Sequence, residues 1–402
     1  MSTSSMISVA EALARVLDGV SPLGPEQVAL TQAAGRTLAY DLHAALTNPP
    51  FDASSMDGYA VRAADIAKIP ARLKVTGESA AGWPFAGTLN AGEAVRIFTG
   101  AQLPDHADTI VIQEETEARD GAVIVTAATP PGANIRLRGA DFHEGETVLA
   151  AGTRLNARHI LLAATSGHAM LAAVRRPVVA ILATGDELVE PCDRPMAGQI
   201  VASNSYGLAA LAAAAGAEPR LIGIARDTPE DLAAKLAEAQ GADVLITTGG
   251  ASVGDHDLVR PALEAAGAKL DFYKIAMRPG KPMFFGRMGK TRVLGLPGNP
   301  LSAMIGARVF LIPMLAKLLG RADTLKPVAA KLARPLPRNG PREHYMRAVL
   351  DTSGTEPLVA PLDVQDSAFV SALVRSNALA VIPANAPALP AGTPVTCLPL
   401  DF

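Results

Sequence analysis

The residues best suited to chemistry lie in three loops between Asp243 and Ser302, and each loop follows an apolar, strand-like run. The loops read TTGGASVGDHD, MRPGKPM and LPGNPLS, and they carry hydroxyl, carboxylate, amide and cationic side chains: Ser252, Asp255, Asp257, Arg278, Lys281, Asn299 and Ser302. Glycine-rich backbone can direct N–H groups at an anion, and paired aspartates beside a phosphate require a hard cation between them. The loops therefore predict a site for a phosphorylated or oxyanionic ligand together with Mg²⁺.

Each of these loops also has a purely structural interpretation. A tight turn needs one or two glycines, whereas the first loop has Gly249, Gly250 and Gly254 beside a serine and two aspartates, which favours function. The RPGKP segment could be an exposed basic turn, but its apolar flanks IAM and MFF argue against a pure surface position. LPGNP on its own is a good helix start, with Asn299 as the N-cap and Pro300 as the first helical residue.

Other polar segments are ambiguous when taken singly. TGDEL places Asp186 and Glu187 directly after a buried run, where acidic residues also complement a helix N-terminus. The upstream segments at 48–60 and 96–104 read as ordinary loops. We find no Ser/His/Asp arrangement, which favours chemistry by a metal ion and by positioning over a covalent enzyme intermediate.

Alternating strand-like and helix-like segments must position these loops. Runs such as VVAILATG and DVLITT are typical of strands buried on both faces. Their alternation with helical segments predicts a doubly wound α/β domain, in which ligands bind outside the carboxyl ends of the strands. The predicted elements are strands at 178–185, 219–226, 243–248 and 292–296, and helices at 204–215, 229–239, 258–266 and 301–319.

The rest of the chain has a different character. Ser8 and Glu11 fit a capping box at the start of an amphipathic helix. Short apolar runs between 28 and 175 predict mainly antiparallel β-structure, and the Pro-rich stretch after Lys326 predicts a small β-barrel-like domain. We divide the chain into an N-terminal helix that packs on the α/β domain (1–26), a connecting domain (27–48 and 141–176), a mainly β domain (49–140), the α/β domain (177–325) and a C-terminal β domain (326–402).

The composition excludes several classes of protein. Of the 402 residues, 49% are hydrophobic and only 19% are charged, so the chain is not largely disordered. The 36 basic and 39 acidic residues nearly cancel, so we expect neither a nucleic acid nor a membrane as partner. The two cysteines, Cys192 and Cys397, lack metal-ligand spacing, and the N-terminus lacks the pattern of a secretory signal. These features predict a soluble, cytoplasmic protein.

Taken together, the motifs resemble the molybdopterin molybdenumtransferase family, which includes bacterial MoeA and the E domain of gephyrin. The match covers nearly the whole chain in the family's order: NPPFDASSMDGYA, RIFTGAQLPDHADTIVIQEE, RLRGADFHEGE, ATGDEL, GQIVASNS, TTGGASVGDHD, MRPGKPM and GLPGNPLSA. The resemblance implies an elongated four-domain homodimer. It implies hydrolysis of adenylylated molybdopterin with molybdate as substrate and Mg²⁺ as cofactor, which gives molybdenum cofactor and AMP. Contacts with the adenylyltransferase and with molybdoenzyme acceptors are also implied.

The resemblance also implies roles for individual residues. The implied catalytic residues are Asp57, Thr99, Asp141, Glu187, Asp227 and Asp257, of which Glu187, Asp227 and Asp257 would hold the metal. The implied substrate-binding residues are Asp186, Gly249, Gly250, Ser252, Arg278, Lys281, Pro297, Asn299, Pro300 and Ser302. The implied molybdate-binding residues are Arg278, Lys281, Ser302, Arg347 and Ser367, the last two from the EHYMR and QDS segments. Because the family's second domain reaches the partner's site, Asp57 and Thr99 are expected to act across the dimer.

Two other functions stay open at this point. A molybdopterin adenylyltransferase shares the α/β fold, but such enzymes are usually a single α/β domain with a different loop after TTGG. A scaffold is the second alternative, because the gephyrin E domain also clusters receptors; here the implied catalytic carboxylates are intact and no partner-binding extension is visible. The sequence does not distinguish molybdate from tungstate as the substrate.

Overall fold

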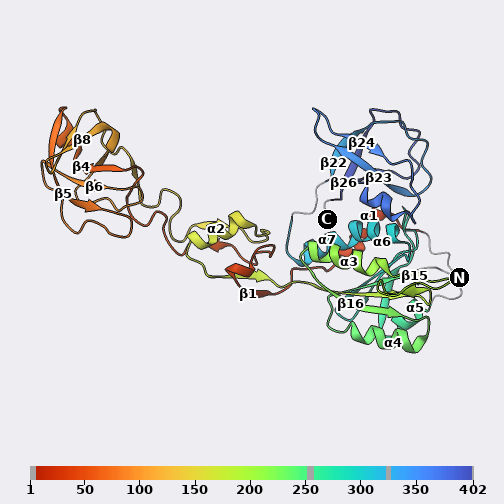
Figure 1. Cartoon of the computed structure of the whole chain (residues 1–402). Helices are drawn as coiled ribbons and strands as arrows, with labels where there is room; N and C mark the ends of the chain where they lie inside the picture. Colours follow the sequence, from red (N-terminus) through yellow and green to blue (C-terminus); the bar gives the residue numbers. More distant parts are fainter. Residues whose placement is uncertain (1–5, 251–257, 323–326, 401–402) are drawn as a thin grey trace. The chain divides into compact units, whose positions relative to one another are not determined.

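The computed structural model describes residues 6–250, 258–322 and 327–400, and Figure 1 labels its helices and strands. The chain forms two compact units. Unit 1 comprises Met1–Glu26, Gly35–Ala39 and Ala172–Phe402, and unit 2 comprises Gln27–Ala34 and Tyr40–Leu171. Strands β1 (Pro25–Ala29) and β12 (Met170–Val174) run across the boundary in the sequence.

Unit 2 is built mainly from β-strands, as the sequence predicts. Its six-stranded sheet has the order β7-β4-β6-β5-β9-β8 and is antiparallel except for the β5–β6 pair. Helix α2 (Ala157–Thr165) is capped by Asn156, whose side chain accepts N–H groups of the first turn. The strands are β2 (Leu42–His43), β3 (Ala53–Ser54), β4 (Gly58–Val61), β5 (Ala71–Ser79), β6 (Glu93–Ile97), β7 (Thr109–Ile112), β8 (Thr116–Arg119), β9 (Ala122–Val125), β10 (Ile135–Arg136) and β11 (Thr147–Leu149).

The α/β part of unit 1 confirms the predicted doubly wound architecture. Its sheet has the order β16-β13-β17-β21-β20-β18. The parallel strands are β13 (Val178–Thr184), β16 (Glu218–Ala225), β17 (Val244–Thr248) and β21 (Thr291–Leu296). One face carries α1 (Val9–Leu17), α3 (Ser203–Ala214) and the helix at 300–318, and the other carries α4 (Pro229–Glu238) and α5 (Val259–Ala265). A short parallel pair, β14 (Leu188–Val189) and β15 (Ile200–Val201), follows β13.

Two antiparallel strands at one edge of this sheet were not predicted. They are β18 (Ala268–Phe272), which pairs with β20, and β20 (Phe284–Met288), which pairs with β21. Their sequences, AKLDF and FFGRM, are short and interrupted by charged residues. They therefore lack the continuous apolar run that identifies a strand buried on both faces.

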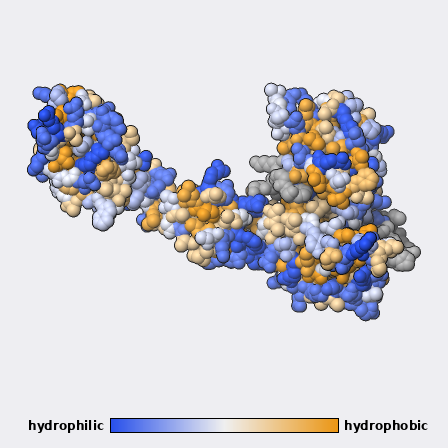
Figure 2. All heavy atoms as spheres, viewed as in Figure 1, coloured by the Kyte–Doolittle hydropathy of each residue, from blue (hydrophilic) through white to orange (hydrophobic). Residues whose placement is uncertain are grey.

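The long closing helix is the core helix of unit 1. It consists of α6 (Pro300–Gly306), a π-helical turn η4 (Ala307–Leu311) and α7 (Ile312–Leu318). Pro313 lacks an N–H and its ring crowds the preceding turn, which accounts for the wider π turn. The stretch is long and apolar enough to cross a membrane, but 78% of it is buried inside the protein. On the face that Figure 2 shows, hydrophilic and hydrophobic residues are interspersed over each unit.

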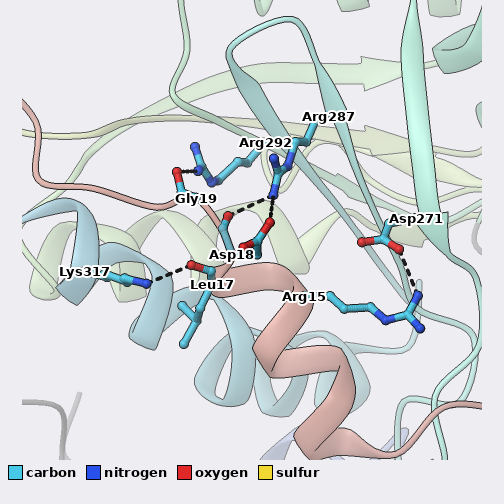
Figure 3. Close-up of polar contacts among 8 residues, drawn as sticks. All are labelled: Arg15, Leu17, Asp18, Gly19, Asp271, Arg287, Arg292 and Lys317. Atoms are coloured by element: carbon cyan, nitrogen blue, oxygen red, sulfur yellow. Dashed lines mark hydrogen bonds and ion pairs between the residues drawn. The ribbon is translucent and has the colours of Figure 1, made fainter.

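The carboxyl end of the N-terminal helix α1 is hydrogen-bonded to the α/β part of unit 1 (Figure 3). Three basic side chains donate to backbone carbonyls there: Lys317 to Leu17 at 2.9 Å, Arg287 to Asp18 at 2.8 Å and Arg292 to Gly19 at 2.6 Å. Cations in this position satisfy carbonyls that have no partner within the helix and complement its dipole. The apolar side of α1, including Ala12 and Val16, is fully buried in the core of the sheet.

The C-terminal part of unit 1 is a closed five-stranded barrel, which confirms the predicted β-barrel-like domain. β23 (Glu343–Asp351) pairs with β24 (Leu358–Pro361), and the ring continues through β22 (Val328–Leu332), β26 (Pro394–Pro399) and β25 (Ala378–Ile382) back to β23. A short helix, α8 (Val370–Val374), precedes β25. From the α/β part, β19 (Met277–Arg278) pairs in parallel with β23, so the RPGKP loop lies against the barrel.

Candidate active site

The first cavity lies at the carboxyl ends of the parallel strands, where the strand order reverses between β13 and β17. It has a volume of about 370 Å³. Residues from the ends of β13 and β17, from the start of α3 and from the loop after β21 line it: Thr184, Glu187, Ser203, Asn204, Ser205, Thr248, Gly249, Gly298, Asn299 and Pro300 among them. Doubly wound sheets bind ligands at such a crossover, so the cavity stands where the fold predicts a binding site.

Polar atoms around the first cavity lack partners within the described residues. The Asn204 and Asn299 side-chain oxygens and the Ser205 hydroxyl are buried and make no hydrogen bond. Asn299 occupies the N-cap position of α6 as predicted, but its side chain forms no capping bond. The Asn204 amide donates to the Gly298 carbonyl at 2.8 Å, which ties α3 to this loop. Unsatisfied buried polar groups are costly, so these atoms point to a polar ligand.

Glycines let the loops approach one another closely at this cavity. Gly185 and Gly249 have φ angles of +146° and +94°. A Cβ on Gly249 would collide with the Thr184 carbonyl oxygen, and one on Gly185 would collide with the Glu187 carboxylate. The loops after β13 and β17 therefore need glycine at both positions.

The predicted carboxylates gather at the ends of two neighbouring strands. Asp186 and Glu187 follow β13, and Asp227 follows β16; the Asp227 N–H donates to Asp186 Oδ1 at 3.2 Å. Arg226 donates to the Asp186 carbonyl at 2.9 Å and holds the two loops together. Asp257, like Ser252 and Asp255, lies outside the described residues. Within the described ranges no group of three or more acidic, histidine or cysteine residues forms a metal cluster.

The donor set nevertheless fits Mg²⁺. This ion usually binds one or two carboxylates together with substrate phosphates and waters, and it does not need an all-protein cage. Glu187 lines the cavity, and Asp227 adjoins Asp186 at the same edge of the sheet. Two carboxylates at this edge of the sheet, one of which lines the cavity, match that requirement.

A second cavity of about 420 Å³ lies between the RPGKP loop, α6 and the barrel. Its residues are Arg278, Pro279, Gly280, Lys281, Pro282, Ser302, Arg342, His344, Gln365, Asp366 and Ser367. It adjoins the first cavity, because Pro300 and Ser302 on one helical turn line different cavities, as do Ala368 and Ser367. Three cationic side chains and two hydroxyls suit a tetrahedral oxyanion.

The structure brings together four of the predicted molybdate residues, namely Arg278, Lys281, Ser302 and Ser367. Arg347 does not line this cavity. Its side chain is 1% exposed and donates to the Val364 carbonyl at 2.8 Å, and its backbone N–H donates to Gln365 at 3.1 Å. Arg347 thus holds the segment that carries Ser367. Of the remaining predicted residues, Pro297 is buried, and neither it nor Gly250 is among the residues lining the cavities described here.

Several lining residues were missed from the sequence. Asn204 and Ser205 belong to the GQIVASNS segment, and small polar residues at the start of an otherwise Ala/Leu-rich helix were the available signal. Arg342 directly precedes the EHYMR segment and His344 lies within it, but only Arg347 was nominated from that segment. Burial, followed by the neighbouring guanidinium groups of Arg278, Arg342 and Arg347, lowers the pKa of His344 to about 4.

In unit 2, the upstream loops converge on a polar cluster. The Asp57 carboxylate accepts the Thr99 N–H and hydroxyl, both at 2.8 Å, and these bonds, with the nearby Arg96 charge, lower the pKa of Asp57. Arg96 lies over the ring of Tyr59, 5.0 Å from its centroid. Asp141 accepts the Asn48 amide at 3.0 Å, which joins the RLRGADFHEGE segment to the NPPFDASSMDGYA segment.

A family model described as a probable molybdopterin binding domain matches residues 180–317. Together with the sheet, the barrel and the two adjoining cavities, this match defines the chain as a multidomain α/β enzyme of the molybdopterin-binding class. Models of the MoeA N-terminal region (domains I and II) and the MoeA C-terminal region (domain IV) match residues 7–167 and 329–400. The chain belongs to the MoeA, or molybdopterin molybdenumtransferase, family, whose members are enzymes of molybdenum cofactor biosynthesis.

Individual relatives are similar over nearly their whole length. The molybdopterin molybdenumtransferase of Nostoc sp. is 40% identical over 94% of this chain and 89% of its own. That of Haemophilus influenzae is 34% identical over 98% of this chain and 99% of its own. The crystal structure of a molybdopterin biosynthesis MoeA protein from Pyrococcus horikoshii matches with a TM-score of 0.87 and 30% identity, covering 99% of this chain and 100% of that one.

Proposed function

We propose that this chain transfers molybdenum from molybdate to adenylylated molybdopterin and releases AMP. The observation that carries the proposal is the pair of adjoining cavities, one lined by the Glu187 carboxylate and neutral polar atoms and the other mainly by cations and hydroxyls. The first suits a phosphorylated pterin and its nucleotide, and the second suits molybdate. Their contact through α6 supports transfer of the metal oxyanion from the second cavity to the pterin dithiolene in the first.

In this proposal the protein acts by binding and orientation. Arg278 and Lys281 offset the charge of the molybdate dianion, and the hydroxyls of Ser302 and Ser367 donate to its oxygens. The unpartnered Asn204, Ser205 and Asn299 atoms bind polar groups of the pterin nucleotide. Holding both reactants in adjoining cavities makes their encounter effectively intramolecular.

Glu187 and Asp227, joined by Asp257, would hold Mg²⁺ beside the phosphoanhydride. When bound, the ion polarises that bond and neutralises charge developing on AMP. Asp186 orients the Asp227 loop by accepting its N–H at 3.2 Å. Metal binding to two or three carboxylates also offsets their mutual repulsion, which otherwise opposes binding of a phosphate.

We further propose a homodimer in which the Asp57–Thr99 cluster of one subunit completes the site of the other. The paired hydrogen bonds from Thr99 hold the Asp57 carboxylate ionised and fixed in orientation, although the residue is only half-buried within its own unit. A half-buried carboxylate restrained in this way is suited to contact a group outside its own unit. The same assignment implies that the protein is soluble. It also implies that the protein receives its substrate from an adenylyltransferase and passes its product to molybdoenzymes.

The test measures AMP release from adenylylated molybdopterin with Mg²⁺, with and without molybdate. Wild type should release AMP only when molybdate is present, and Asp227→Asn and Asp257→Ala should lose this activity. Glu218→Gln is the matched control, because Glu218 begins the strand that Asp227 follows and lies at its opposite end. Consumption of ATP in place of AMP release would indicate an adenylyltransferase, and a folded dimer without hydrolysis would indicate a scaffold.

A further inference from the structure

The second cavity contains a titratable side chain to which the proposed reaction assigns no role. His344 is 7% exposed and lines the cavity beside Arg278, Lys281 and Arg342. It lies opposite Arg278 in the register of β19 and β23, and residues paired in this way project on the same face of a sheet. Within the described residues its ring nitrogens have no hydrogen-bond partner, so they are available to a ligand.

The charged groups around this imidazole are mostly cationic. The segments packed against it contribute Arg278 and Lys281 from β19 and its loop, Arg342, Glu343 and Arg347 from β23 and its approach, Arg338 from the 336–340 segment, and Asp366 from the opposing loop. Glu343 accepts the Tyr345 hydroxyl at 2.5 Å, and the register neighbour on β25 is the apolar Ile382. With no anion in the cavity, burial and the guanidinium charges hold the pKa of His344 at about 4, so its ring is neutral near pH 7.

We propose that His344 contacts the bound oxyanion and takes up one proton as molybdate binds, so that the dianion and a proton enter the site together. The inference rests on the proposed function, because it takes molybdate as the ligand of this cavity. A dianion beside the ring offsets the repulsion from the three arginines and adds an attraction of its own, and both effects favour the charged imidazolium. The proton comes from solvent, and no bond in the oxyanion is broken.

Linkage gives the direction of the pH dependence. A ligand that raises the proton affinity of a group must itself bind more tightly as the pH falls through the pKa of that group in the complex. In the empty site His344 is protonated only in acid, whereas in the complex it becomes protonated at a higher pH. The affinity for molybdate should therefore rise as the pH falls from about 8 to about 6, by up to about tenfold per pH unit at the steepest point.

The experiment counts protons by calorimetry. The full-length protein is titrated with sodium molybdate near pH 6 in two buffers that differ in ionisation enthalpy, and the difference in heat gives the protons taken up per molybdate. Wild type should take up a measurable fraction of a proton, approaching one. His344→Gln, which keeps a hydrogen-bonding side chain but cannot titrate, should bind molybdate with no uptake. The control is His106→Asn, because His106 is exposed in unit 2 at a φ of 73°, a conformation that asparagine adopts readily.

The outcomes separate this inference from the proposed function. Molybdate binding by wild type without proton uptake, or uptake that persists in His344→Gln, would overturn the role of His344 alone. Absence of molybdate binding to folded wild type would refute the molybdate site and this inference with it. If His344→Gln does not fold, proton NMR of the seven wild-type histidines decides the question. One ring must titrate at a higher pH when molybdate is present, and seven unchanged titrations would reject the proposal.

Discussion

Ser302 provides a specific test of the second cavity. We propose that its hydroxyl binds the oxyanion, and within the described residues this hydroxyl makes no hydrogen bond that supports the fold. The side chain is 5% exposed and lines the cavity in the first turn of α6. Within the described residues its hydroxyl makes no hydrogen bond, and Pro300 already starts the helix. We predict that Ser302→Ala weakens molybdate binding while the free energy of unfolding stays within about 0.5 kcal/mol of wild type.

The expected loss follows from the burial of this residue. A hydrogen bond to a charged group contributes about 1.5–3 kcal/mol, which corresponds to a rise of about 10–150-fold in the molybdate KM. Ser302 is buried in the wall of the cavity, so a loss within this range is expected. The assay is AMP release at saturating adenylylated molybdopterin with varied molybdate, together with urea unfolding of the same variant.

Ser166→Ala is the matched control, because it should show the opposite pattern. Ser166 is also buried, but its hydroxyl donates to the Ala163 carbonyl at 3.1 Å within unit 2. Loss of this hydrogen bond in Ser166→Ala should lower the free energy of unfolding by about 1 kcal/mol and leave the molybdate KM unchanged. An unchanged molybdate KM in Ser302→Ala, or a loss of stability equal to that of the control, would refute the assignment of Ser302 to the oxyanion.

Three further substitutions test other parts of the account. Thr99→Val removes one of the two bonds that lower the pKa of Asp57; that pKa should rise, and the acidic limb of the pH–rate profile should move to higher pH. Gly249→Ala forces an alanine to a φ of +94° against the Thr184 carbonyl, so calorimetric affinity for the pterin nucleotide should fall by at least about tenfold. Asp243→Asn breaks a bidentate ion pair with Arg175, whose two bonds measure 2.6 and 2.8 Å. Because Arg175 is 42% exposed, the free energy of unfolding in urea should fall by only about 1–2 kcal/mol. An unchanged urea midpoint would show that the pair contributes nothing to stability.

The sequence identifies the sheet well, because its buried parallel strands are continuous apolar runs. β13 and β17 follow the predicted ranges closely, and α4 begins at Pro229 after a Thr228 cap, as predicted. The edge strands β18 and β20 escape prediction because charged residues interrupt them and tertiary pairing overrides their weak propensity. The helix at 301–319 is predicted, but the π turn that Pro313 causes within it is not.

The site is only partly readable from the sequence, because distant segments meet there. Loop chemistry nominates Arg278, Lys281 and Ser302 correctly as neighbours. His344 joins them only through the parallel pairing of β19 with β23, which no local pattern indicates. Arg347 does not line the second cavity and donates to the Val364 carbonyl, so its role in binding molybdate stays a prediction. Asp257 and Ser252, outside the described residues, stay predictions, as do the domain limits and the dimer.

The central claim is that an oxyanion in the second cavity drives hydrolysis in the first. The most direct measurement compares the AMP released with the molybdenum incorporated into the pterin product, for wild type and for Arg278→Gln/Lys281→Met. The account predicts one AMP per molybdenum for wild type. It predicts that the double variant still binds adenylylated molybdopterin but releases AMP no faster when molybdate is added. Molybdate-dependent AMP release at the wild-type rate by the double variant, or AMP release by wild type without molybdenum incorporation, would contradict it.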